Sequence, residues 1–99
     1  MKQIKELAEH IEAELHDAHE YIETALMYKD SDRELADMYA DLSREEINHA
    51  HMEHEQAVRL IRAQRTAPPA EMLAVWDYLH KRHVENEAEV KRLQAMYKE

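Results

Sequence analysis

The chain has 99 residues, enough for one domain spanning residues 1–99. It contains no Gly, no Cys and only two Pro, and it is rich in the helix formers Glu, Ala, Leu, Lys, Arg, Gln and Met. Strands and tight hairpins depend on Gly-containing turns and β-branched runs, whereas Ala, Leu, Glu and Met lose little free energy on entering a helix. We therefore expect an all-α fold.

The formal net charge of −9 makes the surface acidic. Such a surface repels phosphate and attracts cations, so we expect neither nucleic acid nor a membrane as a partner. Without Cys there is no disulfide, thiolate zinc site or iron–sulfur cluster. No apolar run reaches the roughly 18 residues of a membrane span, and the acidic N-terminal segment does not resemble a signal peptide. We expect a cytoplasmic protein.

Two breaks divide the sequence into three helical segments, at about residues 4–29, 32–65 and 69–98. Ser31 and Glu34 fit a capping box at the start of the second helix, and Pro68-Pro69 separates the second helix from the third. The short first connection predicts that the first two helices form a long antiparallel hairpin. A hairpin of this length cannot bury both of its apolar stripes, so either the third helix or a second chain must cover them.

The first predicted helix carries one apolar stripe, flanked by Tyr21 and Tyr28. Its members recur at helical spacing: Ile4, Leu7, Ile11, Ala18, Ile22 and Ala25. Glu14 falls on this stripe, one turn after Ile11 and one turn before Ala18. Charged residues that point elsewhere are expected on a solvated face: Glu12, His16, Glu20 and Glu23.

The second predicted helix has an apolar stripe with a polar middle. The stripe comprises Leu35, Met38, Leu42, Glu46, His49, Glu53 and Leu60. A buried carboxylate costs several kcal/mol unless it is neutralised, paired or bound to a metal. Glu46 and His49 are neighbours at i and i+3 and can reach the same point. His51 and His54 are expected to project to the other side, away from this site.

These residue types at this spacing are typical of a two-metal carboxylate site. In helical bundles such a site takes a Glu from one helix and Glu-x-x-His from its neighbour, twice over. This chain supplies one set, Glu14 with Glu46-x-x-His49, and a homodimer with a two-fold axis would supply the second. The metal-free alternative is that Glu46 and His49 pair with each other, or with Arg and Lys across the bundle.

The third predicted helix places a histidine on an apolar stripe. The stripe comprises Met72, Trp76, Leu79, His83, Val90 and Tyr97. A lone His on such a face is more often a core residue than a ligand. If this helix packs beside the second, His83 and Glu87 can join Glu53 in a second metal site or an ion entry path.

Residues 36–50, Ala-Asp-Met-Tyr-Ala-Asp-Leu-Ser-Arg-Glu-Glu-Ile-Asn-His-Ala, resemble the second helix of rubrerythrins and encapsulated ferritins, with their Glu-Glu-x-x-His-Ala signature. Glu14 followed by Tyr21 resembles their first helix, and the likeness covers residues 11–62. It implies Glu14, Glu46 and His49 as iron ligands, with Tyr21 near the site. It also implies a ferritin-like four-helix bundle formed by two copies, holding two irons per dimer and oxidising Fe(II) to Fe(III).

Two features depart from these families. The chain has no Cys-x-x-Cys module, so the electron route of full-length rubrerythrins is not implied. Residues 92–99 lack the small and hydrophobic targeting peptide of encapsulin cargo, so an encapsulin shell is not expected as a partner.

Three functions are compatible with these residues. The first is a ferroxidase, in which Glu14, Glu46 and His49 of two chains hold Fe(II) in a dimer or higher oligomer and Glu53 orients His49. The second is a non-catalytic protein in which zinc, manganese or iron staples the dimer. The third is a metal-free helical oligomerisation module.

Overall fold

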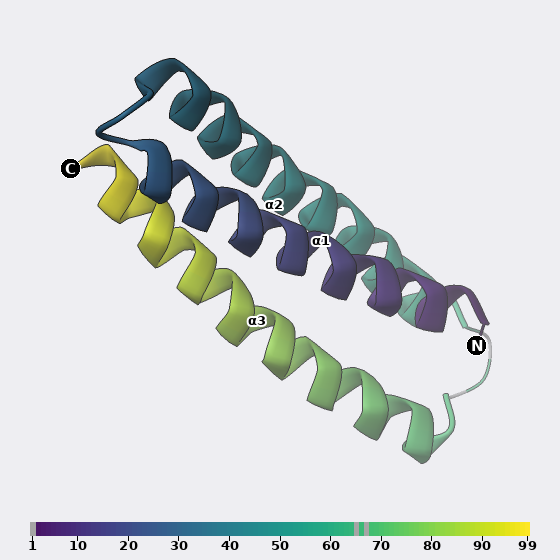
Figure 1. Cartoon of the computed structure of the whole chain (residues 1–99). Helices are drawn as coiled ribbons and strands as arrows, with labels where there is room; N and C mark the ends of the chain where they lie inside the picture. The colour runs from purple at the N-terminus through teal and green to yellow at the C-terminus, as the bar shows by residue number, and fades with distance from the viewer. Residues whose placement is uncertain (1, 65, 67) are drawn as a thin grey trace.

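The computed structural model describes residues 2–64, 66 and 68–99, and within them the chain forms three long α-helices (Figure 1). They are α1 (Lys2–Tyr28), α2 (Arg33–Arg62) and α3 (Ala70–Lys98). The all-α class and the packed α1–α2 hairpin are confirmed. Arg65 and Ala67, which the sequence places at the end of the second helix and in the second break, lie outside the described residues.

The helices lie side by side in a rod of 55 × 17 × 17 Å. α1 packs along α2 and α3 contacts mainly α1, while the backbones of α2 and α3 approach each other at few places. α3 runs in the same direction as α1, so the end of α3 lies beside the α1–α2 turn and the start of α1 lies near the end of α2 (Figure 1). No helix in the described part of the chain is long and apolar enough to cross a membrane.

The start of α2 is capped by Asp32 rather than by Ser31. The Asp32 carboxylate accepts a hydrogen bond from the Leu35 backbone N–H at 3.1 Å, which satisfies one of the free donors of the first helical turn. The Ser31 N–H instead donates to the Tyr28 carbonyl at 3.2 Å in the connecting turn. The predicted capping box was therefore wrong, because the helix begins one residue later than that motif requires.

The buried line of α2 differs from the predicted stripe by about one residue. It consists almost entirely of small side chains: Ala36, Ala40, Ser43, Ile47, Ala50 and Ala57. The predicted members lie beside this line, with Met38 at 45% exposure and the His49 side chain at 52%. The prediction placed the large residues innermost, and this was wrong because small side chains let two helix backbones approach closely and push larger neighbours to the flanks.

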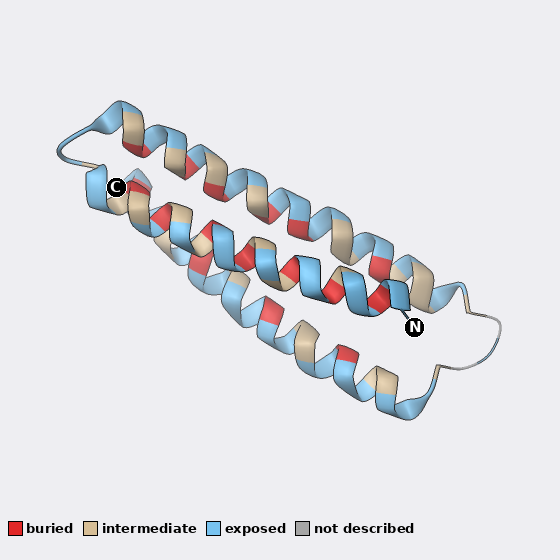
Figure 2. Cartoon of the chain, turned by 45° about the vertical axis from the view of Figure 1, so that its right-hand side comes forward, coloured by how far each residue is buried: buried red, intermediate tan, exposed pale blue. Residues whose placement is uncertain are grey.

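On α1 and α3 the buried residues largely follow the predicted stripes (Figure 2). α1 buries Ile4, Ala8, Ile11, Leu15, Ala18, Ile22 and Ala25, so Ala8 and Leu15 join the predicted line while Leu7 is only half-buried. α3 buries a residue every two turns: Trp76, His83, Val90 and Tyr97. One core cluster surrounds Ile22 and Val90, and a second surrounds Ile4 and Trp76 near the N-terminus of α1.

A buried hydrogen-bond relay joins all three helices. The Gln94 side-chain amide donates to the Ser43 hydroxyl at 3.0 Å, and that hydroxyl donates to the Ala18 carbonyl at 2.7 Å. Both bonds lie at least partly out of water, so an unmade partner would cost more than a solvated one. Ser43 therefore holds α3 to the hairpin as well as fitting the close α1–α2 contact.

We predict that Ser43→Ala lowers the free energy of unfolding by about 1–2 kcal/mol, because it leaves the Gln94 amide without its acceptor. Urea unfolding followed by circular dichroism measures the change. Thr24→Ala is the matched control, since the Thr24 hydroxyl also bonds to a helix carbonyl but does so at an exposed position. Equal effects of the two substitutions would contradict a structural role for the relay.

Candidate metal centre

The hairpin has two faces, and the predicted ligands lie on the one turned away from α3. Asp37, His51 and His54 of α2 contact α3 residues. At about 100° per residue, Glu46, His49 and Glu53 project from the other side of the buried line. We call this side the outer face; it comprises Leu7, Glu14, Tyr21 and Tyr28 of α1 with Leu35, Tyr39, Leu42, Glu46, His49, Glu53 and Leu60 of α2.

The structure brings Glu14, Glu46 and His49 together at the middle of the outer face. Each offers one ligand atom, and these atoms all lie within 4.8 Å of one another. His49 Nδ1 is 3.3 Å from Glu46 Oε1, and the Glu46 side chain is 20% exposed. Glu14 arrives from α1, while Glu46 and His49 share one turn of α2. The three residues thus form a ligand set drawn from two helices.

The carboxylates of this set are held in an unfavourable environment for negative charge. Burial raises the pKa of Glu14 to about 7, and hydrogen bonding to and repulsion from the adjacent Glu53 carboxyl add to the shift. Burial and the charge of Glu14 also raise the pKa of Glu46, against the opposing effect of His49. Glu14 Oε2 is buried and has no hydrogen-bond partner within the described residues. A bound cation would relieve both the repulsion and the missing partner.

The Glu53 side chain, on α2, lies near Glu14 and His10 of α1 and does not contact His49. Its Oε2 lies 4.0 Å from His10 Nδ1, and its carboxyl acts directly on Glu14. The carboxylate that contacts His49 is Glu46. His10 was not predicted near the site, although it precedes Glu14 by one helical turn and therefore shares its face.

Two tyrosines continue the outer face beyond the carboxylates. Tyr21, two turns after Glu14, is half-buried, and its ring centroid lies 6.2 Å from that of Tyr39. Tyr39 was not singled out from the sequence. The sequence pattern could have identified it. Residues of the outer face on α2 recur in alternating steps of four and three from Leu35 to Glu46, and Tyr39 occupies one of these positions.

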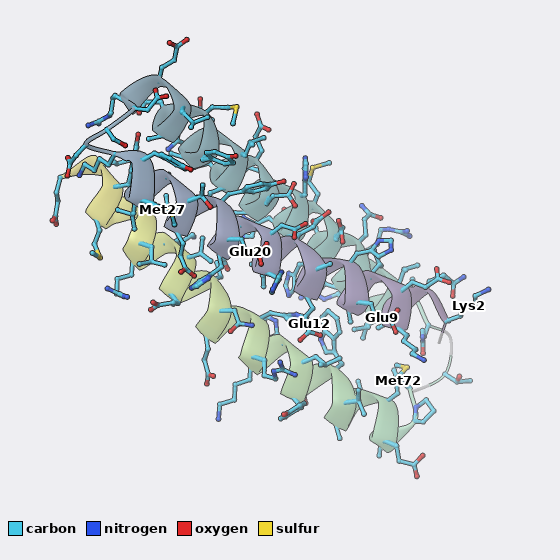
Figure 3. All side chains as sticks on the ribbon, in the orientation of Figure 1. Lys2, Glu9, Glu12, Glu20, Met27 and Met72 are labelled. Carbon is cyan, nitrogen blue, oxygen red and sulfur yellow. The ribbon has the colours of Figure 1, made fainter. Side chains whose placement is uncertain are left out.

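His83 and Glu87 lie on the opposite side of the hairpin from Glu53. They line a cavity with residues of α1 and α2, and Glu87 contacts His51. A further acidic group, His16, Asp17 and Glu20, also brings possible ligand atoms within 4.8 Å, but all three side chains are exposed. Glu20 is exposed on α1, whereas Glu12 lies toward α3, where it forms an ion pair with Arg82 at 3.0 Å (Figure 3).

Comparisons with protein-family models, with curated proteins and with solved structures find no match to this chain. The resemblance to rubrerythrins and encapsulated ferritins is therefore an expectation from residues 11–62, and the chain is assigned to no family. What is established is a three-helix all-α protein with a packed α1–α2 hairpin.

We predict that Glu14→Gln stabilises the metal-free protein increasingly as pH rises. Because the folded-state pKa of Glu14 is about 7 and its ordinary value is 4.5, the wild type loses stability between these values while the Gln variant does not. The difference should grow by about 1–2 kcal/mol, since solvent screens part of the shift at this half-buried position. Urea unfolding with chelator at about pH 5 and pH 8 measures it.

Glu45→Gln is the matched control for this pH dependence, because Glu45 is exposed and adjacent to the site in sequence. Its effect on unfolding should be small and nearly independent of pH. A Glu14→Gln effect that stays constant over the same range would mean that Glu14 is not desolvated as described.

Proposed function

We propose that two copies of this chain pack through their outer faces into a four-helix bundle whose centre is a di-iron carboxylate site that oxidises Fe(II). The observation that carries the proposal is the convergence of Glu14, Glu46 and His49 within 4.8 Å at the middle of a long, half-apolar face. Each chain supplies half of the ligands that such a site requires.

The outer face has the pattern of a helix-packing surface that lacks a partner. Its α2 residues are spaced in alternating steps of three and four, the spacing by which helices interlock. Leu35, Tyr39 and Leu42 are only half-buried, and Tyr28 is 36% exposed. A two-fold axis through the middle of this face would cover the apolar ends of each stripe and bring the two polar centres together.

The same packing would double the carboxylates at the centre, which requires a compensating charge. Glu14, Glu46 and Glu53 lie together in one chain, and the opposing charges that act on Glu14 come from His10 and His49. Without further cations, closing two such faces would bury like charges at a cost of several kcal/mol. Metal ions bound between the chains would supply that charge. Dimerisation and metal binding are therefore expected to be coupled.

The donors fit iron. Several carboxylate oxygens with one imidazole per metal are the ligand set of di-iron sites in helical bundles. Fe(II) is the substrate here, and each ion would lose one electron to O₂ or peroxide. Glu14 and Glu46 would hold the ions after Glu14 gives up its proton, and the His49 imidazole would complete the ligand set of each iron.

A second candidate is a non-catalytic site that staples the dimer. Two carboxylates and one imidazole from a single chain also match the three protein ligands of many zinc sites. The Glu46–His49 contact is also what a metal-free oligomerisation module would contain. Loss of metal on substituting Glu46, together with a rapid ultraviolet absorbance change when Fe(II) meets air, would distinguish the ferroxidase from both.

We predict that the protein binds about one Fe(II) per chain under anaerobic conditions, and only as a dimer or larger assembly. Iron analysis on fractions of known molar mass gives the stoichiometry. Glu46→Ala should abolish stoichiometric binding, whereas Glu45→Ala should retain it because Glu45 is exposed. Iron bound equally by both variants would contradict the proposed ligands.

We also predict that Leu42→Arg weakens dimerisation by about 100-fold or more, because packing the outer faces would bury a long, hydrated side chain in place of a half-buried leucine. Sedimentation equilibrium of the metal-free and metal-loaded protein measures the dissociation constant. Val75→Arg is the control, since Val75 is 58% exposed on α3 and lies outside the outer face. A dimer that tolerates Leu42→Arg would place the interface elsewhere.

A further inference from the structure

A second group of possible ligands lies on the side of the hairpin that α3 covers. α2 contributes His51-x-x-His54, and α3 contributes His80-x-x-His83 followed one turn later by Glu87. The two i, i+3 pairs each present both rings from one helix face. With Ile11, Leu15, Ala50 and Val84, these residues line a cavity of about 160 Å³ among the three helices.

Two histidines of this cavity, His80 and His83, have buried ring nitrogens without hydrogen-bond partners among the described residues. His83 is 5% exposed, and neither of its ring nitrogens has a hydrogen-bond partner within the described residues. His80 Nδ1 is likewise buried and unpartnered there. Buried polar atoms are nearly always satisfied by protein, water or a ligand, because an unsatisfied one keeps the full cost of its desolvation. Three unpartnered nitrogens around one cavity therefore indicate that something polar or cationic belongs in it.

The other polar groups around the cavity are of mixed type. The His54 ring lies 4.8 Å from the His80 ring, centroid to centroid, and 5.8 Å from Trp76. At the rim, His51 contacts the Glu87 carboxylate, which also lies 3.4 Å from Lys91 Nζ. His54 and His80 stack on each other, so joint ligation requires their rings to rotate, and the cavity beside them leaves room for this movement.

We propose that this cavity is a zinc site in which His54, His80 and His83 bind Zn²⁺ and His51 or Glu87 completes a tetrahedral shell. The site is separate from the carboxylate centre and goes beyond the proposed iron chemistry. Imidazole nitrogens with at most one carboxylate suit Zn²⁺, whereas the carboxylate-rich outer face suits iron.

The state of the rings and the fold around them support this site. Burial lowers the pKa of His83 and of His54, the direction expected for imidazoles packed among apolar side chains. The cavity also lies where α3 passes between the core cluster around Trp76 and the one around Val90. Because the α2 and α3 backbones approach each other at few places, a zinc ion here would tie α3 to the hairpin.

The site is tested in the Glu46→Ala background, which removes the carboxylate centre while leaving the histidine cavity intact. Competition with a chromogenic zinc chelator should show about one tightly bound Zn²⁺ per chain. Adding His80→Gln or His83→Gln should weaken this binding by about 100-fold or more. His19→Gln is the control; His19 pairs with Glu23 on α1, outside both sites, and its loss should leave zinc binding unchanged. Zinc binding that persists when both His80 and His83 are replaced would overturn the proposal.

A measurement on Glu46→Ala alone covers the case in which these variants fail to fold. Zinc K-edge X-ray absorption should show a shell of three or four light donors that includes at least three imidazoles. A shell dominated by carboxylate oxygens, or the absence of tightly bound zinc, would mean that the histidines serve only as core residues. Either result would leave the iron proposal untouched, because Glu46 is already absent.

Discussion

The close contact between α1 and α2 governs the rest of the structure. Along α2 that contact is made by a line of alanines with Ser43, facing Ala18, Ala25 and isoleucines of α1. Small side chains let the two backbones approach, and every larger or charged neighbour must then leave the plane of the hairpin for one of its two faces. One face is covered by α3, which is fastened through Gln94 and Ser43. The other, the outer face, holds the leucines, tyrosines and carboxylates.

The two faces differ in both donors and cover, and the two proposed metals follow from that difference. On the outer face, Glu14, Glu46 and Glu53 lie close enough for burial and mutual repulsion to raise the pKa of Glu14 to about 7. The repulsion between these carboxylates is unfavourable. A second chain packed on this face would increase it, and bound cations would relieve it. Under α3, the donors are imidazoles in a cavity shared with apolar side chains, and the cost is that of missing hydrogen bonds instead. Iron bound between two chains would relieve the carboxylate repulsion. Zinc bound within one chain would provide the partners that the imidazole nitrogens lack.

The helices, their order and the convergence of Glu14 on Glu46-x-x-His49 were predictable, because composition, proline position and helical spacing are local signals. The burial of α2 was not. The stripe through Leu42 and Glu46 is more apolar than the line through Ala40 and Ser43, so hydrophobicity selects the wrong line by about one residue. Where two helices pack closely, small side chains are favoured at the contact instead. Which residues form that contact depends on the partner helix. The histidine cavity was missed for a similar reason: His54 and His80 are 26 positions apart, and only the path of α3 brings their rings together.

The central claim is that two chains share one carboxylate site, and X-ray diffraction at the iron absorption edge tests it most directly. Crystals grown anaerobically with Fe(II) should show two adjacent anomalous peaks, roughly 3.5–4 Å apart, related by a two-fold axis between two hairpins. Glu14, Glu46 and His49 of both chains should surround them. A single iron held by one chain, or iron confined to the histidine cavity beneath α3, would contradict the claim.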